Sequence, residues 1–171
     1  HDLRAVGREH RIDVVAGPNL TTTVSKTDVL CNAGATGTIT VTQPTIGNPP
    51  YEYSLDNVTW QSSNTFTGLA AGTYTVYYRE LNGCVGSQQI TISEPPALNA
   101  VAASVPVVCN GQANGIITIT ANGGVAPLEY SIDGGVNWQG SNVFNVPAGT
   151  YTIITRDANG CTNPQTINVT E

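Results

Sequence analysis

The chain has no methionine and little charge of either sign. Charged residues make up 11% of its 171 positions, with six basic side chains against twelve acidic ones and a formal net charge of -6. A nucleic-acid-binding protein needs a basic surface to displace the counterions of the phosphates, so nucleic acid is excluded as a partner. Direct insertion into a membrane is also not expected. Without methionine, position 1 is not an initiator, and we expect a processed product or a piece of a longer chain.

The sequence also lacks long apolar runs and helical periodicity. No stretch is long enough for a membrane-spanning helix, and no signal-peptide pattern is visible. Short runs alternate apolar and polar residues instead, as in TITVT (38–42), YEYSL (51–55), TYTVYY (73–78) and QITIS (89–93). Gly, Pro or Asn separate these runs. This pattern predicts an all-β sandwich.

The sequence repeats itself with an offset of about 77–78 positions. AGTYTVYYRELNGC (71–84) matches AGTYTIITRDANGC (148–161), and PYEYSLD (50–56) matches PLEYSID (127–133). We therefore predict two tandem β-sandwich units, at 18–96 and 97–171, each with about seven strand-like runs. In the first unit these runs lie near 20–25, 36–42, 51–55, 58–61, 64–68, 73–80 and 87–93. The proline pair 95–96 forms a short, stiff joint between them.

Residues 1–17 form a separate leading strand that resembles the end of a preceding repeat. RIDVVAGPNL (11–20) matches QITISEPPAL (89–98) position by position, and Ile12, Val14 and Val15 are its apolar residues. Two interpretations remain open. The strand is either the remnant of an excised unit, or it pairs with the open sheet edge of another copy and assembles the chains into a filament.

Each unit has two cysteines in equivalent places. We expect the pairs Cys31–Cys84 and Cys109–Cys161, one disulfide in each sandwich, linking the entry of the second strand to the last hairpin. Each would close a loop of about 53 residues, which stabilises a small domain by roughly 4 kcal/mol in the chain-entropy model. The alternative is four free buried thiols. The clustered spacing of a zinc site is absent from the sequence.

Both units contain many separate motifs in the same order. The series begins with Cys31 in the first unit and with Cys109 in the second. The motifs that follow are GTITV and GIITI (37–41, 115–119), YSLD and YSID (53–56, 130–133), LAAGTYTV (69–76) and DANGC (157–161). This series resembles the SprB repeat of very large surface proteins in gliding and related Bacteroidota. The resemblance implies an immunoglobulin-like β-sandwich in tandem arrays on exported adhesins, delivery by type 9 secretion, and a link to gliding motility. It implies no catalytic residues.

Trp60 and Trp138 occupy equivalent places just after a turn. Paired aromatic side chains on a sandwich could stack on sugar rings, which would make each unit a carbohydrate-binding module for a surface polysaccharide. The alternative is that each Trp caps the sandwich edge and packs on its own core. Recurrent Thr-x-Thr runs are open to the same two interpretations, as a binding face or as ordinary half-solvated strands.

The remaining polar residues give no catalytic or metal site. The histidines, His1 and His10, both lie in the leading strand, and the carboxylates show no recurrent pairing. The sequence from Asp157 to Gly160 begins like a calcium loop but lacks its late glutamate. We interpret it as turn chemistry, and interpret Asp56 and Asp133 as turn residues that bind their own backbone. We expect no enzyme activity, cofactor or metal.

The strand pattern makes two predictions about register. The apolar residues facing the core are Ile39, Val41, Tyr53, Leu55, Phe66, Leu69, Tyr74, Val76, Ile90 and Ile92 in the first unit, and Ile117, Ile119, Tyr130, Ile132, Phe144, Tyr151, Ile153, Ile167 and Val169 in the second. On the solvent face, Glu52 should pair with Arg79, and Glu129 with Arg156, because their strands should be neighbours in one sheet.

Taken together, the sequence predicts an extracellular, cell-surface structural module of an adhesin or filament. Its partners would be neighbouring repeats of the same protein or other copies of it. Carbohydrate binding through Trp60 and Trp138, and filament assembly through the leading strand, are the alternative functions.

Overall fold

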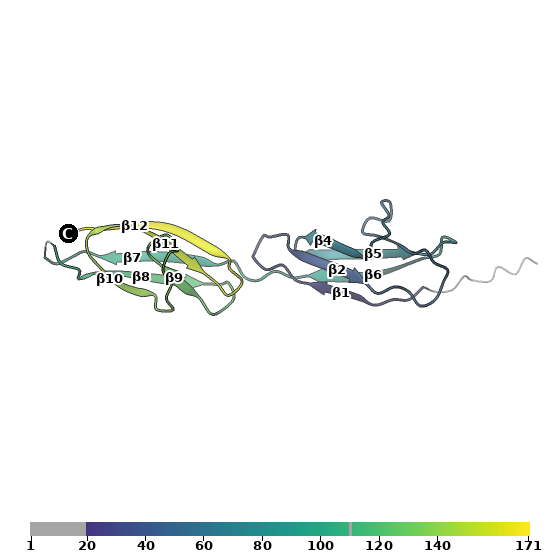
Figure 1. Cartoon of the computed structure of the whole chain (residues 1–171), viewed down its shortest axis with the longest axis horizontal. Coiled ribbons are helices and arrows are strands. Elements are labelled where there is room, and N and C mark those ends of the chain that lie inside the picture. Colours follow the sequence, from purple (N-terminus) through teal and green to yellow (C-terminus); the bar gives the residue numbers. More distant parts are fainter. Residues whose placement is uncertain (1–19, 110) are drawn as a thin grey trace, which may run out of the picture.

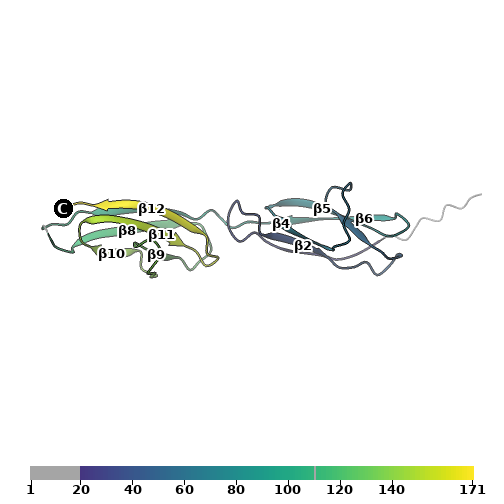
Figure 2. The same cartoon turned by 45° about the horizontal axis from the view of Figure 1, so that its top comes forward.

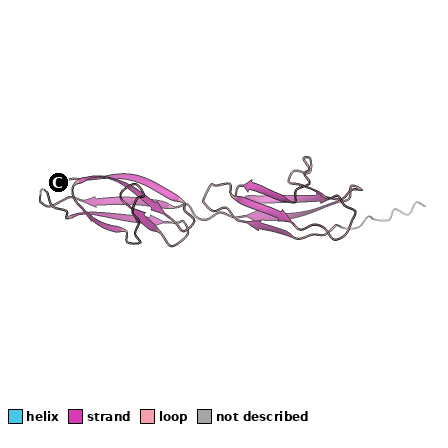
Figure 3. Ribbon diagram, in the orientation of Figure 1, coloured by secondary structure: helices cyan, strands magenta, loops and turns pink. Residues whose placement is uncertain are grey.

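The computed structural model describes residues 20–109 and 111–171, and the predictions for Ile12, Val14, Val15 and the rest of the leading strand lie outside this range. The described residues form strands and loops without a helix (Figure 3). No helix among them could therefore cross a membrane. The strands form two bodies that lie end to end along the long axis of the molecule (Figures 1 and 2).

Each body is a sandwich of two three-stranded antiparallel sheets. In the first body the sheet orders are β1-β2-β4 and β3-β5-β6, and in the second they are β7-β8-β10 and β9-β11-β12. In both, this is the A-B-E and C-F-G arrangement of an immunoglobulin-like sandwich without strand D. The strands are β1 (Val24–Thr27), β2 (Gly37–Val41), β3 (Glu52–Ser54), β4 (Thr65–Leu69), β5 (Gly72–Arg79), β6 (Val85–Ile92), β7 (Asn99–Val105), β8 (Gly115–Asn122), β9 (Glu129–Ser131), β10 (Val143–Val146), β11 (Gly149–Arg156) and β12 (Thr162–Val169).

Each sandwich has its own apolar core, built from alternate residues of its strands. Ile39 and Val76 in the first core, and Ile117 and Ile153 in the second, are fully buried. Every predicted core residue of both units is buried or packs against the buried cluster, so the predicted register is confirmed. The prediction omitted some buried residues, namely Leu20, Val29, Tyr51, Tyr78, Val107 and Val146.

The predicted strand run at 58–61 is a turn. Asp56 accepts hydrogen bonds from the N–H groups of Val58 and Thr59, and this holds the segment in a tight loop. Only Gln61 then returns to the sheet, as an isolated bridge to Tyr53. In a segment of four residues, alternation of apolar and polar side chains did not distinguish a strand from a turn followed by one residue that bridges to the sheet.

The prediction of one disulfide within each sandwich is wrong, because the bond joins Cys31 to Cys161 and so connects the two sandwiches. The Cys31 loop bonds through the N–H of Val29 to Ser93, just after the end of β6 that pairs with the start of β5, whereas Cys84 follows the end of β5. The eight residues of β5 span roughly 25 Å at the usual rise of a strand. A disulfide needs its two Cα atoms within about 7 Å, so neither predicted pair can form in this fold.

Candidate functional site: a bonded joint and a repeated surface cluster

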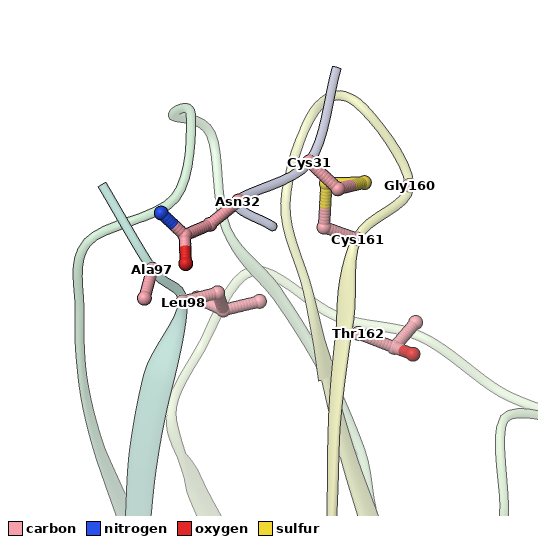
Figure 4. Close-up of a pocket in the computed structure, with 7 residues that line it drawn as sticks. All are labelled: Cys31, Asn32, Ala97, Leu98, Gly160, Cys161 and Thr162. Atoms are coloured by element: carbon pink, nitrogen blue, oxygen red, sulfur yellow. A yellow bond between two sulfur atoms is a disulfide. The ribbon is translucent and has the colours of Figure 1, made fainter. Parts of the chain in front are cut away.

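The joint between the sandwiches consists of the connection from β6 to β7 and the disulfide Cys31–Cys161 (Figure 4). The two sulfur atoms are 2.06 Å apart and the two Cα atoms 5.6 Å apart. A shallow pocket of about 400 Å³ lies between Cys31, Asn32 and the Ala97–Leu98 segment, and it is lined by no charged side chain. The two sandwiches are thus attached at two separate places, the backbone and the disulfide.

On the first sandwich, the loop that carries Cys31 is fastened to the outgoing chain. The N–H of Val29 donates to the carbonyl oxygen of Ser93 at 3.0 Å. The N–H of Ala33 donates to the carboxylate of Glu94 at 2.6 Å, and the Asn32 side chain donates to the carbonyl oxygen of Pro95 at 3.2 Å. Cys31 therefore has a fixed position relative to the start of the linker.

On the second sandwich, Cys161 ends the tight turn between β11 and β12. Asp157, which is only 4% exposed, accepts hydrogen bonds from the N–H groups of Val125, Asn159 and Cys161 at 2.9–3.0 Å. Gly160 has a φ of 81°, which an L side chain rarely adopts. The buried carboxylate thus fixes the turn and places Cys161 at the end of the sandwich that faces Cys31.

The bond is accompanied by a hydrogen bond between the units. The side-chain amide of Asn159 donates to the carbonyl oxygen of Leu30 at 2.8 Å. Because Leu30 precedes Cys31 and Asn159 is two positions before Cys161, this contact orients the two loops on which the disulfide is built. Asn159 is a joint residue that the sequence analysis did not single out.

The predicted ion pairs are present in both sandwiches. Glu52 lies directly opposite Arg79 in the β3–β5 ladder, and Glu129 lies opposite Arg156 in the β9–β11 ladder. The guanidinium nitrogen and carboxylate oxygen are 2.6 Å apart in the first pair and 2.8 Å in the second. Both pairs lie partly in solvent, so we assign them a small contribution to stability.

Each ion pair extends to a tryptophan. The guanidinium carbon of Arg79 lies 4.2 Å from the ring centroid of Trp60, and that of Arg156 lies 3.9 Å from Trp138. This is a cation–π arrangement, and it occupies one face of each ring. The Trp side chains therefore pack on arginine at the sheet surface, outside the core clusters. Carbohydrate binding by Trp60 and Trp138 stays a prediction.

The aspartates predicted to be turn residues bind backbone N–H groups. Hydrogen bonds from the N–H groups of Val58 and Thr59 hold the pKa of Asp56 well below its usual range. Hydrogen bonds from Asn137 and from the hydroxyl of Ser131 lower the pKa of Asp133 to about 2. These carboxylates act as turn anchors, and within residues 20–109 and 111–171 no group of three or more His, Cys, Asp or Glu is arranged to hold a metal.

The fold and the joint define a pair of immunoglobulin-like β-sandwiches in tandem. The SprB repeat family model matches residues 23–59 and 101–137, which lie at equivalent places in the two sandwiches. The resemblance found in the sequence is therefore confirmed, and each sandwich contains a segment that matches the SprB repeat. SprB repeats occur in cell-surface proteins.

Two other comparisons add little to this assignment. No curated protein matches the chain. Among solved structures, an amphioxus IgVJ-C2 molecule matches with a TM-score of 0.36 and 13% identity, over 91% of this chain and 100% of that one.

Proposed function

We propose that the chain is a structural repeat module of an extracellular bacterial surface adhesin or filament. Its role is to extend that protein and to project a binding region away from the cell. Its immediate partners are neighbouring repeats of the same protein, delivery is by type 9 secretion, and the surface it serves belongs to a gliding bacterium.

The observation that carries this proposal is the Cys31–Cys161 bond between successive repeats. A single backbone linker allows two domains to bend about it, whereas a second attachment a short distance away opposes that bending. Both anchor points are rigid, because the loop that carries Cys31 is hydrogen-bonded to Glu94 and the turn that carries Cys161 is held by the carboxylate of Asp157. Disulfides also persist mainly in oxidising compartments, which supports a location outside the cell.

The proposal is tested by the shape of the chain in solution with and without this bond. The double variant Cys31→Ser/Cys161→Ser removes the second attachment and leaves the two cores intact. We expect small-angle X-ray scattering to show a broader distribution of end-to-end distances for this variant than for the oxidised wild type.

The matched control is Cys84→Ser, which removes a thiol that forms no bond in this structure. This variant should scatter like the wild type. Identical scattering from all three proteins would mean that the disulfide does not stiffen the joint, and the proposal of a rigid extending module would be wrong.

A further inference from the structure

The two cysteines without a bond, Cys84 and Cys109, lie at opposite ends of the pair of sandwiches. Cys84 follows β5 in a turn whose neighbour Leu81 donates its N–H to Asn48, at the end of the first sandwich remote from the joint. Cys109 follows Val107, whose N–H donates to the carbonyl oxygen of Thr170 beside the end of β12. The two thiols therefore cannot meet within one folded chain.

The loop that carries Cys109 is built like the loop that carries the bonded Cys31. The N–H of Val107 repeats the hydrogen bond of Val29 to the end of the last strand, at 2.8 Å against 3.0 Å. The N–H of Val108 donates to the Asn114 side chain at 3.1 Å, as that of Leu30 does to Thr36 at 2.9 Å. Cys109 is exposed, whereas Cys31 is half-buried in the formed joint.

The turn that carries Cys84 is built like the turn that carries the bonded Cys161. The N–H of Glu80 donates to the carbonyl oxygen of Cys84 at 3.1 Å, and that of Asp157 donates to Cys161 at 3.0 Å. Gly83 and Gly160 adopt nearly the same positive φ, 84° and 81°. Asn82 occupies the place of Asn159, the residue whose side chain crosses the formed joint.

The exposed groups at the two ends also complement each other. In the formed joint, the carbonyl oxygen of Leu30 accepts the hydrogen bond of Asn159. Val108 stands in the place of Leu30 at one end of the pair and is 81% exposed, while Leu81, beside Asn82 at the other end, is 65% exposed. In the formed joint, Leu30 itself stays 52% exposed, so a repeat stacked on either end would lie beside these side chains without burying them.

We propose that Cys109 and Cys84 are the two halves of a further inter-repeat disulfide. The turn cysteine of a following repeat bonds to Cys109, and the loop cysteine of a preceding repeat bonds to Cys84. The partner is another repeat of the same construction, stacked head to tail in the same polypeptide. The geometry of the Cys31–Cys161 joint would thus recur at each successive junction.

Forming the bond removes two protons and two electrons from the two thiols, and a small-molecule disulfide such as glutathione disulfide takes up the electrons. The thiolate of Cys109 attacks one sulfur of this oxidant and releases one glutathione thiolate. The thiolate of Cys84 then attacks the sulfur of Cys109 and releases the second glutathione. A hydrogen bond to Glu80 raises the pKa of the Cys84 thiol, so this thiol is the less reactive of the two toward free glutathione disulfide. Cys84 therefore reacts second, when the joint holds it next to the mixed disulfide at Cys109.

The test is a tandem duplication in which Glu171 of a full chain is followed directly by residues 17–171 of a second copy. The junction then reads TEGPNL, which matches SEPPAL at the existing joint (93–98). Cys84→Ser in the first copy and Cys109→Ser in the second leave one unmatched cysteine on each side of the new junction. After equilibration with oxidised and reduced glutathione, we expect no titratable thiol, and a peptide map that links Cys109 to Cys84 in monomeric protein.

In the proposed joint, the side chain of Asn82 would donate to the carbonyl oxygen of Val108, as Asn159 does to Leu30. A matched variant with Asn82→Ala in the second copy removes this hydrogen bond and should slow formation of the disulfide several-fold. The proposal is overturned if Cys109 and Cys84 both remain alkylatable while each copy forms its Cys31–Cys161 bond. That result would leave the proposed function standing, because the existing joint would still form, so the two failures can be told apart.

Discussion

At the scale of single residues, equivalent backbone carbonyl groups in the two sandwiches accept hydrogen bonds from different side chains. In the first, the buried ring of Tyr78 reaches across β6 and donates its hydroxyl to the carbonyl oxygen of Leu20 at 3.3 Å. In the second, the equivalent carbonyl of Leu98 accepts a hydrogen bond of 3.3 Å from the side chain of Asn163. Thr155, which stands in the place of Tyr78, is too short to reach it.

Gly86 is the residue that makes room for Tyr78. A Cβ atom at position 86 would lie 2.3 Å from the Tyr78 ring, closer than any real contact. Asn163 stands in the place of Gly86 in the second sandwich, where the small Thr155 leaves space for it. The side-chain volumes at these two positions therefore compensate each other: the large Tyr78 faces Gly86 in the first repeat, and the small Thr155 faces Asn163 in the second.

We expect Gly86→Asn to destabilise the first sandwich by about 1–3 kcal/mol, because the added side chain overpacks the Tyr78 ring. Tyr78→Thr combined with Gly86→Asn reproduces the pair found in the second repeat and should recover much of this loss. Denaturant unfolding of the two single variants and the double variant measures the coupling. Gly140→Asn is the control, since a Cβ there meets no neighbour. Additive effects of the two substitutions would contradict this account.

At the scale of strands and turns, the sequence predicted more of the register than of the connections. Alternation placed Glu52 opposite Arg79 because every residue of a strand has a definite face and partner. Turns lack such periodicity, so the segment after Asp56 was mistaken for a strand. The cysteine pairing failed for a geometric reason. The length of β5 places Cys84 at the end of the sandwich opposite Cys31, and the predicted pairing did not take that distance into account.

The turn after β9 should respond to acid through Asp133. Its pKa, lowered to about 2, means that the folded turn prefers the ionised carboxylate. This stabilisation is complete above the ordinary aspartate pKa of about 3.9 and is lost as the pH falls toward 2. The melting temperature of the second sandwich, followed by the NMR signals of its core methyl groups, should therefore fall between pH 4 and pH 2.

Asp133→Asn should flatten this dependence, because the amide keeps its hydrogen-bonding shape but has no charge to lose in acid. At pH 7 the variant should melt at a lower temperature than the wild type. The first sandwich, in which Asp56 is unchanged, serves as the internal control and should melt as before. Equal slopes for the wild type and the variant in the second sandwich would show that Asp133 is not the titrating group.

At the scale of the whole molecule, the disulfide changes how the chain carries tension. When the chain is pulled at its two ends, the covalent path runs from the N-terminal side to Cys31, across the bond to Cys161, and on to the C-terminus. Among the twelve described strands, only β1 and β12 lie on this path. With the additional bond between Cys109 and Cys84, tension along a series of such pairs would pass only through the segment from Cys84 to Cys109.

Pulling on single molecules should therefore give a short extension when the bond is intact. The bond bypasses a sequence separation of 130 positions, which amounts to roughly 450 Å of extended chain. The extension of the oxidised wild type should not include this length even after both sandwiches unfold. The extension of Cys31→Ser/Cys161→Ser should include it. Cys84→Ser keeps the Cys31–Cys161 bond and should extend like the wild type. If the oxidised chain and the double variant reach the same extension, the disulfide is not in the path of tension.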